Sequence, residues 1–118
     1  MIYHCKECKS PYSDDGLPVT CTNCGGVFTA SLLPFSGNNN PAKPGIWKYK
    51  ASFGLPADAR DVYLGEGDTP LVEIPQAGNE VYTKLEGLNP TGSFKDRNSA
   101  VMTSFLLSRG VNEAVEDS

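Results

Sequence analysis

The sequence contains no long run of apolar residues, and this argues against a membrane-spanning helix, which needs about 20 of them. It also shows no secretory signal, because the polar segment His4-Cys5-Lys6-Glu7-Cys8 begins almost at the first residue. We therefore predict a cytoplasmic protein with no membrane partner. In that compartment, cysteines are expected to be thiolates rather than disulfides.

An excess of basic charge is also missing. The chain has 118 residues and a formal net charge of −4, whereas nucleic-acid binders usually carry a basic patch. Within residues 1–30, Lys6 and Lys9 stand against Glu7, Asp14 and Asp15, for a net charge of −1. This balance predicts no nucleic-acid partner. The length suits one small domain, or a small module joined to part of a larger one.

The cysteines form two identical clips, Cys5-x-x-Cys8 and Cys21-x-x-Cys24, separated by twelve residues. Each clip can present two sulfurs to one tetrahedral ion, and a hairpin between them can bring the clips together. We predict a β-rich zinc ribbon over residues 1–30, with Zn²⁺ in a structural role because four cysteines leave no open coordination position. The alternative is a redox or disulfide pair. His4 is expected to be a surface residue.

Residues 31–60 are predicted to be a linker and a packing arm. The stretch from Pro34 to Pro44 is rich in Pro, Gly and Asn, which favours irregular structure. The arm that follows, Gly45–Tyr49 and Phe53–Pro56, contains the only Trp of the chain and two further aromatic residues. We expect it to pack these side chains on the main domain.

Residues 61–118 carry strand and helix patterns that predict an α/β fold. Strands are expected at 71–74 and 80–86, a helix at about 94–108, and a short buried strand at 111–116. Gly110 is the expected helix C-cap. The expected buried face of the helix consists of Val101, Met102, Phe105 and Leu106. The strand at 80–86, the helix and the strand at 111–116 would form one βαβ unit, whose strands lie parallel. With so few strands, the sheet of this α/β domain would be incomplete.

Two glycine-containing loops precede the helix. The first, Gly65–Pro70, contains two acidic residues and no lysine in P-loop spacing, so we do not expect it to hold phosphate by itself. The second, Asn89-Pro90-Thr91-Gly92, has turn chemistry. Ser93 is predicted to cap the helix, with Asp96 completing a capping box.

Lys95 falls in the first turn of this helix, an unusual place for a cation. The helix N-terminus and Arg97 both favour the neutral amine, whereas Asp96 opposes that effect. A neutral lysine on a strand-to-helix turn is a candidate for forming a Schiff base. The alternative is a solvated lysine whose charge Asp96 offsets.

The segment Glu86-Gly-Leu-Asn-Pro-Thr-Gly-Ser-Phe-Lys-Asp-Arg97 resembles the lysine segment of threonine synthases, in the fold-type-II family of pyridoxal-phosphate (PLP) enzymes. The loop Leu64–Leu71, the segment Gly45–Tyr49 and the N-terminal cysteines resemble threonine synthases that carry a zinc ribbon. In this family many members have Gly where this chain has Asn98.

The resemblance implies a function as well as a fold. Lys95 would bind PLP covalently and act as the catalytic lysine, and the substrate would be O-phosphohomoserine, which reacts with water to give threonine and phosphate. Such an enzyme is a carbon–oxygen lyase acting on phosphate. The family's substrate loop, phosphate loop and pyridine-nitrogen residue would lie beyond Ser118. We therefore expect residues 61–118 to be the truncated first part of a catalytic domain, inactive alone.

Two alternatives stay open at this point. The parent could be another fold-type-II enzyme, such as cysteate synthase or a β-replacing enzyme, because substrate choice lies mostly in segments not present here. The chain could instead be a zinc-ribbon protein-interaction module with a degenerate enzyme remnant.

Overall fold

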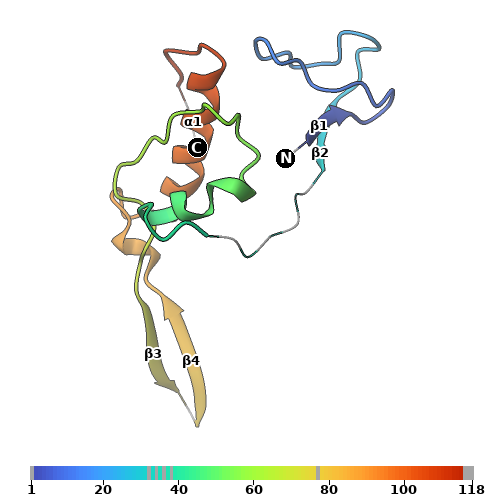
Figure 1. Cartoon of the computed structure of the whole chain (residues 1–118). Coiled ribbons are helices and arrows are strands. Elements are labelled where there is room, and N and C mark those ends of the chain that lie inside the picture. Colours follow the sequence, from blue (N-terminus) through green and yellow to red (C-terminus); the bar gives the residue numbers. More distant parts are fainter. Residues whose placement is uncertain are drawn as a thin grey trace.

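The computed structural model describes residues 2–31, 33, 35, 37, 39–76 and 78–115 and has three parts. A small N-terminal ribbon is followed by a central helical part, and a long β-hairpin, inserted between the two main helices of that part, projects away from the rest (Figure 1). The hairpin makes the molecule elongated, 57 Å in its longest extent and about half that across.

The ribbon is built on two short antiparallel strands, β1 (Ile2–Cys5) and β2 (Phe28–Ser31), with Cys5 opposite Phe28. Tyr12 packs its ring edge against Phe28, with centroids 4.6 Å apart, and lies 5.9 Å from Tyr3. His4 lies within β1 and is half-buried, rather than on the open surface as expected. The ribbon therefore has a core of a few aromatic side chains and needs further stabilisation.

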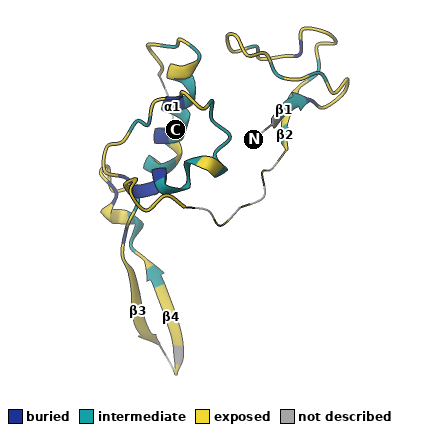
Figure 2. Cartoon of the chain, viewed as in Figure 1, coloured by how far each residue is buried: buried dark blue, intermediate teal, exposed yellow. Residues whose placement is uncertain are grey.

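The central part is organised around Trp47. The 3₁₀ helix η1 (Gly45–Ser52) places Ile46 and Trp47 against Ala100 of helix α1 (Asp96–Ser108), and Phe53 meets the Trp47 ring edge-on at 5.9 Å. Trp47 is only 1% exposed, and Figure 2 shows buried segments on both helices. Trp47 and Phe53 therefore pack as expected of this arm, whereas Tyr49 lies beside Phe35, with ring centroids 6.0 Å apart. Pro34 of the predicted linker lies outside the described residues.

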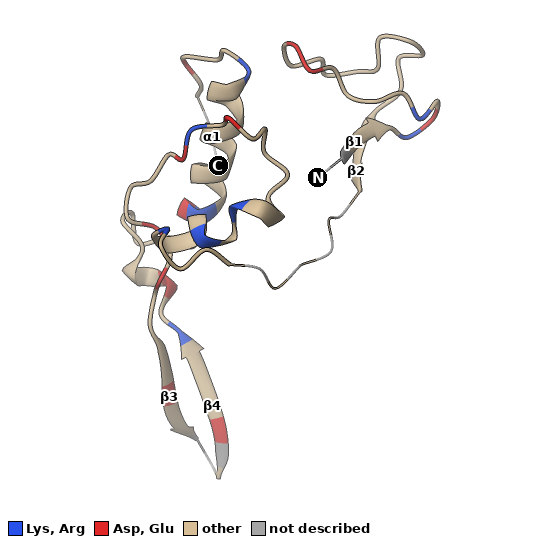
Figure 3. Ribbon diagram, in the orientation of Figure 1, with Lys and Arg blue, Asp and Glu red and all other residues tan. Residues whose placement is uncertain are grey.

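Ion pairs fasten η1 to the segment that follows it. Asp61 accepts hydrogen bonds from Lys43 at 2.6 Å and Lys50 at 2.7 Å, and Lys48 pairs with Asp68. The two lysines hold the pKa of the Asp61 carboxyl below its usual range. Figure 3 shows basic residues on η1 and acidic residues elsewhere in the central part, and the ion pairs offset these charges.

Helix α1 ends as the sequence predicts. Gly110 adopts a φ of 78°, and its N–H donates to Leu107 O, while Val111 N–H donates to Leu106 O at 3.1 Å. This pair of bonds is the Schellman arrangement, which satisfies carbonyls at a helix end and favours glycine at the left-handed position. The helix begins at Asp96, two residues later than expected.

The buried face of α1 differs from the prediction. Val101, Met102, Phe105 and Leu106 are all half-buried, whereas the fully buried residues are Ala100 and Ser104. Small side chains lie there because η1 and the segment around Val62 approach the helix closely. Ser104 Oγ accepts from Val62 N–H at 3.0 Å and donates to Ala100 O at 2.9 Å.

The predicted parallel βαβ unit is wrong for the part of the chain that the structure describes. Strands β3 (Leu71–Gln76) and β4 (Asn79–Lys84) pair with each other as an antiparallel hairpin, Leu71 opposite Lys84. Residues 111–115 form no strand, and Glu116 lies outside the described residues. A parallel strand needs a neighbouring strand edge, but the hairpin points away from the end of α1 (Figure 1). The fold is thus mixed, with helices and antiparallel strands.

The ribbon contacts the C-terminal end of α1. The guanidinium of Arg109 lies over the rings of Tyr12 and Phe105, at 5.7 and 5.1 Å, and its Nη1 donates to Ser13 O at 2.8 Å. Tyr3 packs on Phe105 with centroids 6.2 Å apart.

Within the described residues, no helix has the length and apolar character needed to cross a bilayer.

Candidate functional site

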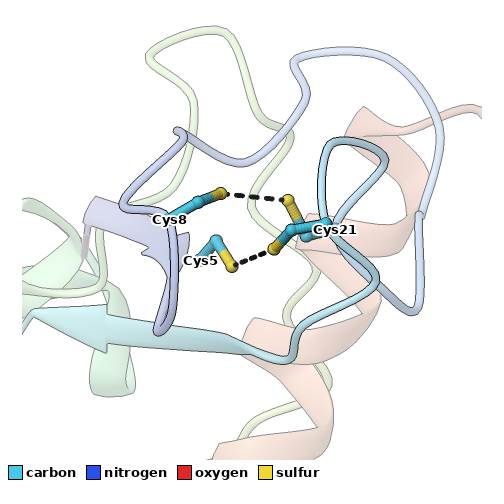
Figure 4. Close-up of side chains that lie close together, drawn as sticks. Cys5, Cys8 and Cys21 are labelled. Atoms are coloured by element: carbon cyan, nitrogen blue, oxygen red, sulfur yellow. Dashed lines mark hydrogen bonds between the residues drawn. The ribbon is translucent and has the colours of Figure 1, made fainter.

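The four cysteines converge on one point of the ribbon, as the two-clip pattern predicts. All four Sγ atoms lie within 4.8 Å of one another. Cys5 Sγ is 3.6 Å from Cys24 Sγ, and Cys8 Sγ is 3.6 Å from Cys21 Sγ; Figure 4 shows the sulfurs pointing toward one another. A tetrahedral ion with metal–sulfur bonds of about 2.3 Å requires sulfurs about 3.8 Å apart. The donor set therefore fits a four-sulfur metal site, and the thiols are free rather than bridged.

The two clips have the same backbone structure. In the first clip, Cys5 N–H donates to Ser10 O and Lys9 N–H donates to Cys5 O. In the second clip, the equivalent bonds run from Cys21 N–H to Gly26 O and from Gly25 N–H to Cys21 O. These four bonds are 2.7 to 3.0 Å long. Each clip thus closes into the same tight turn, which presents its two sulfurs to a common centre.

Gly26 keeps the space beside the sulfurs open. A Cβ at this position would lie 3.1 Å from Cys5 Sγ, 3.3 Å from Cys24 Sγ and 2.9 Å from Glu7 Cγ. The absence of a side chain here lets the second clip approach the first.

The thiols are not equivalent without an ion. Hydrogen bonds from Ser10, first through its hydroxyl and then through its backbone, lower the pKa of Cys8 to about 6. A backbone hydrogen bond with Gly26 acts to lower the pKa of Cys24, but the neighbouring thiols of Cys8 and Cys5 outweigh it and raise this pKa to about 12. An ion bound by four thiolates must therefore displace protons from the cluster.

Lys95 lies at the other candidate site, immediately before helix α1. Its backbone is already helical, with φ −63° and ψ −24°, and its side chain is exposed. Within the described part of the chain, no hydrogen bond or ion pair holds its ammonium group. The backbone is therefore fixed while the amine can move.

The predicted capping box is absent, and a different contact closes the turn. Asp96 accepts hydrogen bonds from Thr91 N–H at 2.8 Å and from Thr91 Oγ1 at 2.5 Å, instead of reaching back to Ser93. Ser93 Oγ accepts from Lys95 N–H at 3.2 Å but does not cap α1. Asp96 thus ties the two ends of the short segment 91–96 together.

A second, outer contact encloses the same segment. Glu86, in the 3₁₀ turn η2 (Glu86–Leu88), and Arg97, in the first turn of α1, form a two-point ion pair. Arg97 Nε donates to Glu86 Oε2 and Nη2 donates to Oε1, both at 2.8 Å. The hydrogen bonds from Arg97, first, and from Thr69 and Asn89 lower the pKa of Glu86 to about 2. The sequence alone did not predict that Glu86 and Arg97 would form this ion pair.

The loop at residues 65–70 has a structural role in the fold, because its Glu66 and Thr69 side chains are buried. Glu66 is 1% exposed and accepts hydrogen bonds from Trp47 Nε1 at 3.1 Å and Leu64 N–H at 2.8 Å. Gly67 N–H donates to Asn89 Oδ1 at 3.0 Å. Buried acidic residues are rare, so sequence alone does not signal that Glu66 would lie inside.

Comparison with known proteins connects these sites to a family. The family model described as pyridoxal-phosphate dependent enzyme matches residues 62–118, the part that contains Lys95, Glu86 and Arg97. This chain belongs to the pyridoxal-phosphate-dependent enzyme family. No solved structure is matched at a significant level.

Curated relatives extend the similarity of this PLP-family chain to the ribbon. The threonine synthase of Methanosarcina acetivorans is 34% identical over 94% of this chain, and that of Methanocaldococcus jannaschii is 32% identical over 86%. A threonine synthase from a Bacillus species is 49% identical over 45% of the chain. The chain spans 30% of the length of the first relative and 28% of the second.

Proposed function

We propose that this chain is the N-terminal part of a PLP-dependent enzyme similar to threonine synthase, with Lys95 as the lysine that binds the cofactor. One observation carries the proposal: the turn that fixes the backbone of Lys95 and leaves its amine free lies within the matched PLP-family region. Lys95 would bind PLP covalently through Nζ. When bound, PLP supplies an electron sink beside the substrate α-carbon.

The residues of this chain would have two tasks in that reaction. Nζ of Lys95 would accept and return protons at substrate carbon atoms, because its exposed side chain would reach the bound cofactor and substrate. The segment 86–97 would hold its backbone in place. The proposed substrate is O-phosphohomoserine, with water as second reactant and threonine and phosphate as products. Product analysis with O-phosphohomoserine and O-phosphoserine separates this activity from a cysteate synthase-like one.

The four cysteines would hold a structural Zn²⁺ in residues 1–30 of the proposed enzyme. Their sulfur spacing supports this role, and a closed four-sulfur site leaves no position for a substrate. Residues 31–60 would join the ribbon to the catalytic part at 61–118. We expect the protein to act in the cytoplasm.

Borohydride reduction tests the role of Lys95 independently of turnover. The protein is incubated with PLP, reduced and digested with trypsin. A reduced PLP adduct on Lys95 blocks cleavage there, so the expected product is the uncut peptide 85–97 carrying the cofactor mass. Lys95→Arg should remove this adduct, whereas the control variant Lys84→Arg, at the end of the preceding strand β4, should retain it. An adduct on other lysines only, or its persistence in Lys95→Arg, contradicts the proposal.

A further inference from the structure

The segment that bears Lys95 is held by polar contacts among buried and partly buried side chains. Thr69 is 5% exposed; its Oγ1 donates to Glu86 Oε1 at 2.7 Å and accepts from Arg97 Nη2 at 2.9 Å. Asn89 is 4% exposed, and its Nδ2 donates to Glu86 Oε2 at 3.0 Å. We call Thr69, Glu86, Asn89 and Arg97 the polar clamp.

The Glu86 carboxylate is the centre of the polar clamp. It accepts four hydrogen bonds, two from Arg97, one from Thr69 and one from Asn89. A carboxylate satisfied in this way has one preferred orientation, because each oxygen meets two donors. The clamp therefore fixes the chain at positions 86 and 97, on either side of the turn.

The clamp also fixes the turn relative to the loop at 65–70. Thr69 belongs to that loop, and Asn89 binds it through Gly67 N–H. The inner contact between Thr91 and Asp96 then closes the turn itself. Lys95 lies between Asp96 and Arg97 on one side and Ser93 on the other, so its Cα has little freedom although its amine is exposed.

We propose that the polar clamp positions Lys95 for covalent cofactor binding, with Glu86 and Arg97 as positioning residues that touch neither cofactor nor substrate. The inference rests on the proposed function of Lys95. A reacting amine must meet its carbonyl carbon within a narrow range of distance and angle, and a displacement of about 1 Å can cost about 100-fold in rate. The clamp would hold the backbone of Lys95 in place, and the free side chain would let its amine reach the carbonyl carbon at the required distance and angle.

A matched pair of substitutions separates positioning from general stability. Glu86→Gln keeps the shape of the side chain but removes the negative charge of the carboxylate to which Arg97, Thr69 and Asn89 donate hydrogen bonds. Asp61→Asn removes charge from the ion pairs with Lys43 and Lys50, which do not touch segment 86–97. Circular dichroism at the working temperature checks that both variants are folded.

Two readouts are then compared. The first is the initial rate of borohydride-trapped PLP on Lys95. The second, which needs no cofactor, is cleavage after Lys95 by a lysine-specific protease, relative to cleavage after Lys6 in the same sample. We expect Glu86→Gln to lower the trapping rate about tenfold or more and to raise cleavage after Lys95 by a similar factor. Asp61→Asn should change both by less than about twofold.

The outcomes distinguish the two proposals. If the wild-type protein gives no Lys95 adduct, the proposed function fails, and the protease result alone decides whether the clamp holds the turn. If the adduct forms on the wild type and Glu86→Gln traps PLP at the rate of Asp61→Asn, the positioning role is overturned. Equal cleavage after Lys95 in both folded variants overturns it as well.

Discussion

Lys9 and Gly25 occupy the same position in two copies of one turn. Each follows the second cysteine of its clip, each donates its N–H to the carbonyl of the first cysteine, and their φ angles are 63° and 73°. A left-handed conformation costs little for glycine but about 1–2 kcal/mol for a residue with a Cβ. The first clip therefore carries strain that the second does not.

This relationship predicts opposite effects of two substitutions on ribbon stability. Lys9→Gly should raise the free energy of unfolding by about 0.5–1 kcal/mol, and Gly25→Ala should lower it by about 1 kcal/mol. Denaturant unfolding in the presence of zinc measures both. Lys6→Gly is the control, because Lys6 is exposed in the same clip without a positive φ. If Lys9→Gly destabilises as much as Lys6→Gly, strain at Lys9 is refuted.

Removing the metal should unfold the ribbon and spare α1. The aromatic core of residues 2–31 is small, so much of the folding free energy of this part would come from metal binding. After treatment with a chelator, we expect the amide NMR signals of the ribbon to lose dispersion while the helical circular dichroism signal persists. Chelator saturated with zinc is the control. Unchanged ribbon signals after complete zinc loss would contradict a structural metal.

Cobalt substitution tests the ligand set itself. The wild-type protein should bind one Co²⁺ and show the spectrum of tetrahedral cobalt with four thiolates. Cys24→Ser should weaken binding and change that spectrum. Thr22→Ser, within the same clip, should leave both unchanged, because its side chain is not a ligand. An identical spectrum for wild type and Cys24→Ser would remove Cys24 from the site.

Two serines on α1 provide a matched test of buried hydrogen bonding. Ser104 is fully buried and accepts from Val62 N–H, whereas Ser108 is exposed and only donates to Phe105 O at 2.6 Å. Ser104→Ala leaves the partly buried N–H of Val62 unpaired and should cost about 1–3 kcal/mol in the free energy of unfolding. Ser108→Ala should cost less than about 0.5 kcal/mol. Thermal unfolding compares them, and equal costs would contradict the buried contact.

The Glu86–Arg97 pair should make stability depend on pH in the acid range. The folded pKa of Glu86 is lowered to about 2, mainly by Arg97, whereas an unfolded glutamate has a pKa of about 4.3. The contribution is therefore complete above about pH 5 and is lost as the pH falls toward 2. Urea unfolding of wild type and Glu86→Gln should show a stability difference that shrinks over this window. A difference that does not change between pH 6 and 2 would rule out the ion pair.

Local patterns in the sequence are sufficient to predict several features of the structure. The spacing of the cysteines predicts their convergence because each clip closes within its own turn, and Gly110 predicts the end of α1 because only the last helical turn is involved. The packing of Trp47 on the main part of the protein is also predicted correctly, since a large aromatic ring is costly to leave in water.

Contacts between distant segments were decided only by the tertiary structure. Ser93 and Asp96 have the spacing of a capping box, but Thr91 offers Asp96 two donors and binds its carboxylate instead. Ala100 and Ser104 are buried because Trp47 and Val62 come close to them, which helical periodicity cannot show.

Contacts between distant segments also explain why the strand predicted at 111–116 is absent from the described residues and why the polar clamp was not predicted. The apolar pattern at 111–116 suits a strand, but a strand forms only where another offers its edge, and β3 and β4 pair with each other. Glu86 and Arg97 are eleven positions apart, and nothing local brings them together. The sequence by itself determined the turns of the two cysteine clips, the helix end and the sulfur cluster. The tertiary structure decided which polar groups are buried, because each needs a partner from elsewhere in the chain.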